Sequence, residues 1–101
     1  MKTFKDLKFE RNPMMGWGAT EKFDNGLIIS VQASEGHYCT PRENCKSVDD
    51  YVSFEIAIWD DNDPSKGWKT REFIPDLNDD VATCIDREEI SAIMLAIQNK
   101  K

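Results

Sequence analysis

The sequence is poor in the residues that build catalytic and metal centres. It has one histidine, three cysteines and five glycines among 101 residues. It contains none of the G-x-S-x-G, P-loop or G-x-G-x-x-G motifs that place a nucleophile or hold phosphate groups. The N-terminal segment lacks the apolar stretch of a signal peptide, and no apolar run approaches the roughly 20 residues that span a membrane. We therefore expect a cytoplasmic, non-enzymatic protein without cofactors, whose thiols are reduced.

Basic residues are also scarce. Thirteen Lys and Arg face nineteen Asp and Glu, for a net charge of −6. Without basic clusters, direct binding to nucleic acid or to an anionic membrane is not expected. The acidity is compatible with a basic protein partner, and more commonly serves solubility alone. The length and the 40% apolar content indicate one domain, residues 1–101, with a packed core.

The clearest structural pattern is a β-hairpin from Met15 to Ala33. Two alternating apolar runs flank Asp24, Asn25 and Gly26, a strong turn signal. A three-residue loop keeps the apolar residues, starting at Met15, on one face, whereas a two-residue loop divides them between two faces. The pairs that this register predicts are Phe23 with Leu27, Ala19 with Val31 and Trp17 with Ala33.

A second alternating segment, from Tyr51 to Trp59, predicts another strand. Its core face is expected to contain Val52, Phe54, Ile56 and Ile58. Tyr51 and Trp59 would then stand at the ends of a solvated face. The segment 68–74 is predicted as the strand that completes a second hairpin, and the segment 81–85 fits either a short strand or a lead-in.

The last segment predicts a helix. Asp86 is a good N-cap, and Glu89 follows at capping-box spacing. An apolar stripe at helical spacing comprises Ile90, Ile93, Met94 and Ile97. The expected fold is α+β: an antiparallel β-sheet of about four strands, in two hairpins, covered on one face by this C-terminal amphipathic helix.

Four residues suggest an alternative function as a small zinc-binding module. His37, Cys39, Cys45 and Cys84 make a Cys3His set that zinc accepts in a tetrahedron. The spacing offers no C-x2-C knuckle, and Cys84 lies beside Ile85, as a small core residue does. His37 is also the only candidate base for Cys39 or Cys45, but no third group or cleft is evident to complete a catalytic site.

The segment from Asp61 to Glu72 has part of the pattern of a calcium-binding loop. Asp61, Asp63, Ser65 and Glu72 fall at EF-hand positions, but Lys66 replaces the required glycine and the flanking segments predict strands. A solvated acidic loop is the preferred interpretation.

The remaining hypothesis is recognition of a protein. Acidic residues cluster in loops that are expected to meet at one end of the fold, and aromatic residues near strand ends are typical anchors of interfaces. The predicted partner-binding residues are Asp60, Asp61, Asp63, Tyr51, Trp59 and Trp68. The expected partner is a basic or nucleic-acid-binding protein, and both a monomer and a homodimer remain open.

Three segments resemble a class of small phage- and prophage-encoded accessory proteins. They are residues 23–31, residues 51–58 and residues 79–90, the last leading into the terminal helix. The resemblance implies an accessory protein of the infected bacterial cytoplasm, one that binds and modulates or inhibits a host or defence factor. It implies no catalytic residue and no ligand.

Overall fold

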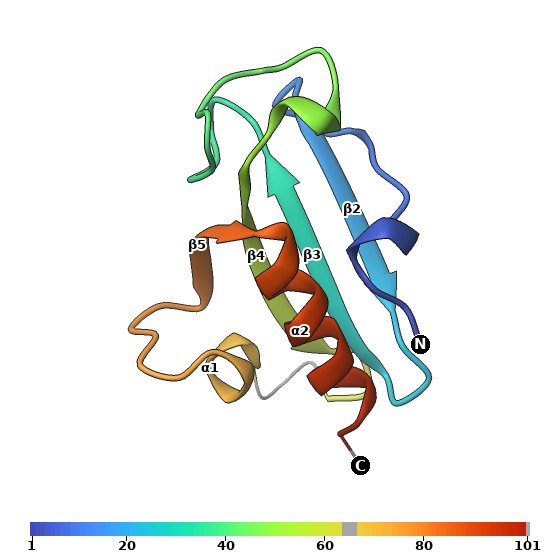
Figure 1. Ribbon diagram of the computed structural model, residues 1–101. Coiled ribbons are helices and arrows are strands. Elements are labelled where there is room, and N and C mark those ends of the chain that lie inside the picture. The colour runs from blue at the N-terminus through green and yellow to red at the C-terminus, as the bar shows by residue number, and fades with distance from the viewer. Residues whose placement is uncertain (64–66, 101) are drawn as a thin grey trace.

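The computed structural model describes residues 1–63 and 67–100. In this part of the chain, five strands form one antiparallel sheet whose order follows the sequence. The strands are β1 (Glu10–Arg11), β2 (Trp17–Lys22), β3 (Leu27–Ala33), β4 (Ser53–Asp60) and β5 (Val81–Asp86). Helix α2 (Arg87–Gln98) lies across one face of the sheet (Figure 1). The predicted α+β fold is confirmed, with five strands in place of about four.

Three short helical segments complete the described elements. They are the 3-10 turns η1 (Phe4–Asp6) and η2 (Val48–Asp50) and the single-turn helix α1 (Thr70–Phe73). None of the helices in residues 1–63 and 67–100 is long and apolar enough to cross a membrane.

The β2–β3 hairpin has the register that the sequence predicts. Ala19 pairs with Val31 and Trp17 pairs with Ala33. Gly26, at the last loop position, has φ of 89°, a left-handed conformation that glycine adopts without steric cost. The predicted start of the apolar face at Met15 is wrong, because Met15 is 66% exposed and precedes the strand in a turn with φ of 68°.

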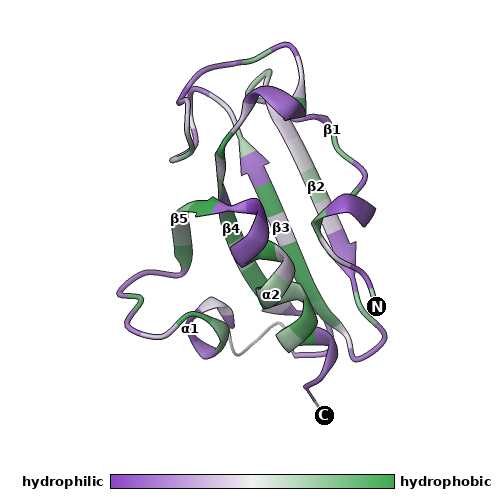
Figure 2. Ribbon diagram, viewed as in Figure 1, coloured by the Kyte–Doolittle hydropathy of each residue, from purple (hydrophilic) through white to green (hydrophobic). Residues whose placement is uncertain are grey.

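Helix α2 covers the face on which the hairpin's apolar residues lie. The Asp86 side chain accepts the N–H of Glu89 at 2.8 Å, as predicted for the N-cap. The predicted apolar stripe of the helix is buried, and Figure 2 shows apolar segments of β3 and β4 beneath it. The large, fully buried apolar side chains of this core are Ile29, Val31, Tyr51, Phe54, Ile56, Ile58, Ile90, Met94 and Ile97.

The start of β4 differs from the prediction. Val52, expected in the core, is 66% exposed, whereas Tyr51, expected on a solvated face, is 1% exposed. The strand begins only at Ser53, and Tyr51 is the residue that ends the turn η2. Strand alternation therefore does not extend back to these two residues. It holds from Phe54 onward.

The segment 68–74 is not a strand. Only Trp68 pairs with β4, through an isolated bridge to Trp59, and the chain then turns into α1. The fifth strand is instead β5, which settles the open choice for segment 81–85. Its register with β4 shifts between Phe54 and Ile56, where a bulge places Thr83 and Cys84 opposite the single residue Glu55.

Candidate partner-binding surface

We call the face of the sheet opposite α2 the open face. A row of large side chains lies across this face near one end of the sheet. Side chains alternate along strands, so residues paired across the ladder share a face. Lys22 pairs with Ile28, Ile28 with Trp59, and Trp59 with Trp68. Because neighbours of Ile28 and Trp59 in sequence face α2, this row lies on the open face. Ile28 is buried, so the apolar surface that this row exposes consists of Trp59 and Trp68, close to one end of the sheet.

The two tryptophans at the end of this row contact each other directly. Their ring centroids are 5.5 Å apart and their planes are inclined at 89°. This edge-to-face arrangement is a favourable one for aromatic rings. Trp68 is nevertheless 49% exposed and Trp59 only half-buried. An aromatic pair that is ordered by its own contact and still accessible has the properties of an interface anchor.

A buried hydrogen-bond network holds the segment that contains Trp68. The Thr70 hydroxyl, fully buried, accepts the N–H of Ile58 at 2.9 Å and donates to the carbonyl of Asp80 at 2.6 Å. Lys69 donates its backbone N–H to the Ile58 carbonyl at 2.7 Å. Thr70 thus joins the end of β4 to the start of β5 and fixes the chain beside Trp68.

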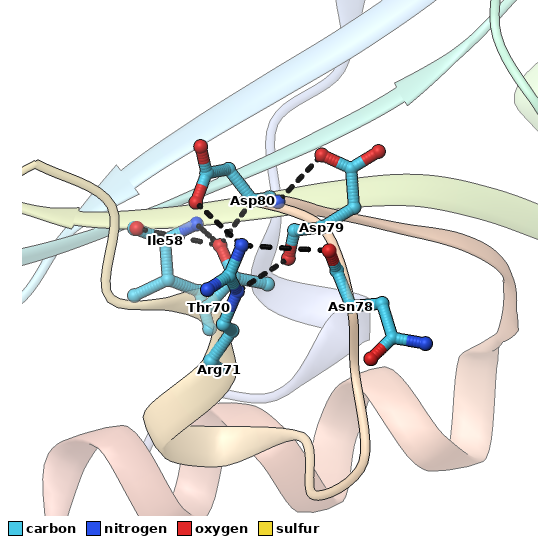
Figure 3. A network of polar contacts seen from close by, with 6 residues as sticks. All are labelled: Ile58, Thr70, Arg71, Asn78, Asp79 and Asp80. Atoms are coloured by element: carbon cyan, nitrogen blue, oxygen red, sulfur yellow. Dashed lines mark hydrogen bonds and ion pairs between the residues drawn. The ribbon is translucent and has the colours of Figure 1, made fainter.

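Arg71 closes the same network from outside. Its guanidinium donates to the carbonyls of Asn78 and Asp79 and lies 3.7 Å from an Asp80 carboxylate oxygen (Figure 3). The Asp79 carboxylate accepts the N–H of Asp80 at 2.7 Å. These contacts involve exposed side chains, so the buried Thr70 hydroxyl is the stronger constraint.

The predicted acidic residues of this loop separate onto two sides of the sheet. Asp61 lies at the open face, where its carboxylate is 2.7 Å from the Lys22 ammonium. Asp60 pairs with Leu27, whose side chain is in the core, and therefore lies on the α2 side. The Asp60 carboxylate accepts the N–H of Asn62, and Asp63 donates its N–H to the Asp60 carbonyl. Asp61 thus contacts the row at Lys22, at the end opposite Trp68.

The other acidic groups are divided between the two ends of β5. Asp80 precedes the strand and Asp86 ends it, opposite Ser53. Asp49 joins the Asp86 end, 3.7 Å from the Arg87 guanidinium. The sheet therefore does not gather all the acidic loops at one end.

Tyr51, predicted as an interface anchor, is an internal residue instead. Its hydroxyl donates to the Glu43 carbonyl at 2.6 Å and accepts the N–H of Cys45 at 2.9 Å, and its ring packs on Phe54. Burial raises the pKa of this phenol. Tyr51 therefore holds the loop between β3 and β4 in place and is removed from the proposed surface.

The four residues of the zinc hypothesis occupy dissimilar environments. Cys39 is buried, with its thiol 3.3 Å from the Ser34 carbonyl, and burial raises the pKa of the thiol. Cys45 is half-buried. Cys84, expected in the core, is exposed, because the bulge in β5 gives it φ of 55° and reverses the alternation there.

His37 contributes to a local turn. Its Nδ1 lies 2.6 Å from the Ser34 hydroxyl, which also accepts the N–H of Gly36. Ser34 is fully buried, so this serine–histidine contact is closed to a substrate. Within residues 1–63 and 67–100, no group of three or more His, Cys, Asp or Glu side chains is placed to hold a metal ion. The zinc hypothesis gains no support from this arrangement.

Part of the predicted calcium loop lies outside the residues that the structure describes. Ser65 and Lys66 lie outside the described residues. Asp61 is engaged with Lys22, and Glu72 lies 3.2 Å from the Lys100 ammonium. The two flanking carboxylates thus have different partners.

Sequence reasoning missed the small apolar residues of the open face. Ile28, Ala57 and Val81 share this face with Trp59, by the pairing of Ile28 with Trp59 and of Ala57 with Val81. The signal was present in the run Leu27–Ile28–Ile29, where strict alternation calls for a polar residue in the middle. An apolar residue on the polar side of a strand indicates a second apolar surface.

Comparison of the chain with models of protein families, with curated proteins and with solved structures gave no match.

Proposed function

We propose that this protein is a non-enzymatic binding protein that engages a basic protein partner through the Trp surface, defined as Ala57, Trp59, Asp61, Trp68 and Val81. The observation that carries the proposal is the edge-to-face contact of Trp59 with the half-exposed Trp68 on the open face. Exposed apolar patches with aromatic centres and polar rims are typical of protein interfaces. The overall charge of −6 favours association with a basic partner.

The resemblance to phage and prophage accessory proteins suggests where the partner is found. A protein made in an infected bacterium meets the proteins of the host cytoplasm, including defence factors that bind nucleic acid through basic grooves. We propose that the Trp surface binds such a basic host protein and thereby modulates or inhibits it.

Capture from bacterial lysate tests this proposal with a matched pair of variants. Trp68→Ala truncates the exposed tryptophan of the open face. Leu95→Ala truncates an exposed apolar residue, 36% exposed, on helix α2 at the other side of the sheet. We expect a basic protein that is retained by the wild type and by Leu95→Ala and is lost with Trp68→Ala. Equal retention by both variants excludes the Trp surface as the binding site.

A further inference from the structure

Aromatic rings elsewhere in this protein have cationic side chains of the same chain placed over them. Arg11 lies 4.3 Å from the centroid of Trp17, and Arg42 lies 4.3 Å from that of Tyr38. Arg87 and Lys100 lie over Phe4 and Phe73 at 5.1 and 5.6 Å. Among the residues that the structure describes, no cation is placed over Trp59 or Trp68. Trp59 and Trp68 thus differ from Trp17, the third tryptophan, whose ring Arg11 covers.

The geometry of the pair suits a planar cation. A cation is attracted to the face of an indole ring, which carries the negative end of the ring quadrupole. Since the planes of Trp59 and Trp68 meet at 89°, the two rings form a corner with a face on each side. A guanidinium can stack on one face while its edge approaches the other. Tryptophan is the best of the aromatic residues for this interaction.

A carboxylate on the same face adds the second feature of an arginine site. Asp61 pairs with Lys22 through side chains that are 51% and 58% exposed. An exposed ion pair of this kind contributes little to stability and exchanges partners readily. A guanidinium can donate hydrogen bonds to a carboxylate while the plane of the group stacks on an aromatic ring. The ammonium group of lysine is not planar and combines these two contacts less well.

We propose that the corner between Trp59 and Trp68 receives an arginine side chain of the partner protein, with Asp61 as its carboxylate acceptor. This inference rests on the proposed function and names the chemistry of the partner. A second copy of this chain is a poor occupant. A two-fold interface would bring together two chains that each have a net charge of −6, which opposes their association.

Titration with a blocked Gly-Arg-Gly-Arg-Gly peptide tests the assignment, with the indole N–H signals of the three tryptophans as the readout. The matched probe replaces each arginine by citrulline, which keeps the shape and removes the charge. We expect the arginine peptide to move the signals of Trp59 and Trp68. The signal of Trp17 should stay, because Arg11 already covers that ring. Trp68→Ala should remove the shift at Trp59, and Asp61→Asn should weaken binding about threefold.

The outcomes separate this inference from the proposed function. Any one of three results overturns the arginine site. They are equal shifts with the citrulline peptide, equal shifts at all three tryptophans, and no shift at Trp59 and Trp68 with the arginine peptide. If Trp68→Ala still abolishes capture of the lysate partner in those cases, the Trp surface stands and only the identity of the bound group is wrong. Unchanged backbone amide signals show that each variant keeps the fold.

Discussion

Trp68 takes the place beside Trp59 that a longer fifth strand would otherwise fill. Strand β5 pairs with β4 only as far as Ala57, and beyond it the bridge from Trp59 to Trp68 continues the sheet. Lys69 then bonds to Ile58, and the chain leaves the sheet as α1. An indole at this position lies at the margin of the sheet. It contacts Trp59 on one side and solvent on the other.

Replacing Thr70 by Val should destabilise the fold and loosen Trp68. The hydroxyl is fully buried and bonds to the Ile58 N–H and the Asp80 carbonyl, which valine leaves without this partner. We expect a loss of about 1–3 kcal/mol in the free energy of unfolding, measured by urea titration. Thr20→Val, an exposed threonine of strand β2, is the control and should change stability far less. Equal effects of the two substitutions contradict a structural role for the buried hydroxyl.

Gly26→Val tests the three-residue hairpin loop. Gly26 has φ of 89°, a conformation in which a β-branched residue is strained, and the Cβ of valine would overlap the Asn62 side chain. We expect Gly26→Val to lower the free energy of unfolding by about 2 kcal/mol. Gly26→Asn carries the same Cβ but tolerates the left-handed region, so it should lose distinctly less. An unchanged melting temperature for Gly26→Val would show that the loop has another conformation.

The sequence predicts structural features that depend only on nearby residues, because the signals for these features are local. The register at Ala19 and Val31 follows from alternation and a glycine turn, and the cap at Asp86 follows from its spacing to Glu89. Trp59 and Trp68 are both among the predicted partner-binding residues, but the sequence does not predict their contact, since it depends on a bridge outside the regular strands.

Errors arose where a tertiary feature changed the alternation. The bulge in β5 exposes Cys84, and the turn η2 buries Tyr51 in place of Val52. Segment 68–74 is predicted as a strand, yet the chain turns into α1 there, where the buried Thr70 hydroxyl bonds to Ile58 and Asp80. The separation of Asp60 from Asp61 likewise follows from where β4 ends, which composition does not reveal.

The buried thiol of Cys39 predicts a loss of stability at alkaline pH. Burial raises its pKa above the ordinary value of 9.0, so the unfolded chain ionises first. The contribution of Cys39 to stability is therefore fully present below the unfolded-state pKa of 9.0. It is lost as the pH rises through the higher pKa of the folded state. Unfolding free energies between about pH 8 and pH 10 should fall less steeply for Cys39→Ala than for wild type. Parallel slopes for the two proteins contradict the assignment.

Charge reversal of Asp61 should weaken capture of the partner without unfolding the protein. Asp61→Lys replaces the carboxylate at the open face and places two lysines side by side, since Lys22 is 2.7 Å away. Because both side chains are exposed, stability should change by no more than about 0.5 kcal/mol. Glu35→Lys, in the loop after β3, is the charge-matched control. Partner binding should fall with salt for wild type and for Glu35→Lys. Identical binding by the two variants removes Asp61 from the surface.

Site-specific photo-crosslinking in bacterial cells tests the central claim most directly. A benzophenone amino acid replaces Trp68 in one variant and Leu95 in another, both at exposed positions but on different sides of the sheet. The proposed surface predicts one discrete adduct with a basic protein from position 68 and none from position 95. Adducts from position 95 alone, or the same adducts from both positions, would contradict binding through the face that contains Trp59 and Trp68.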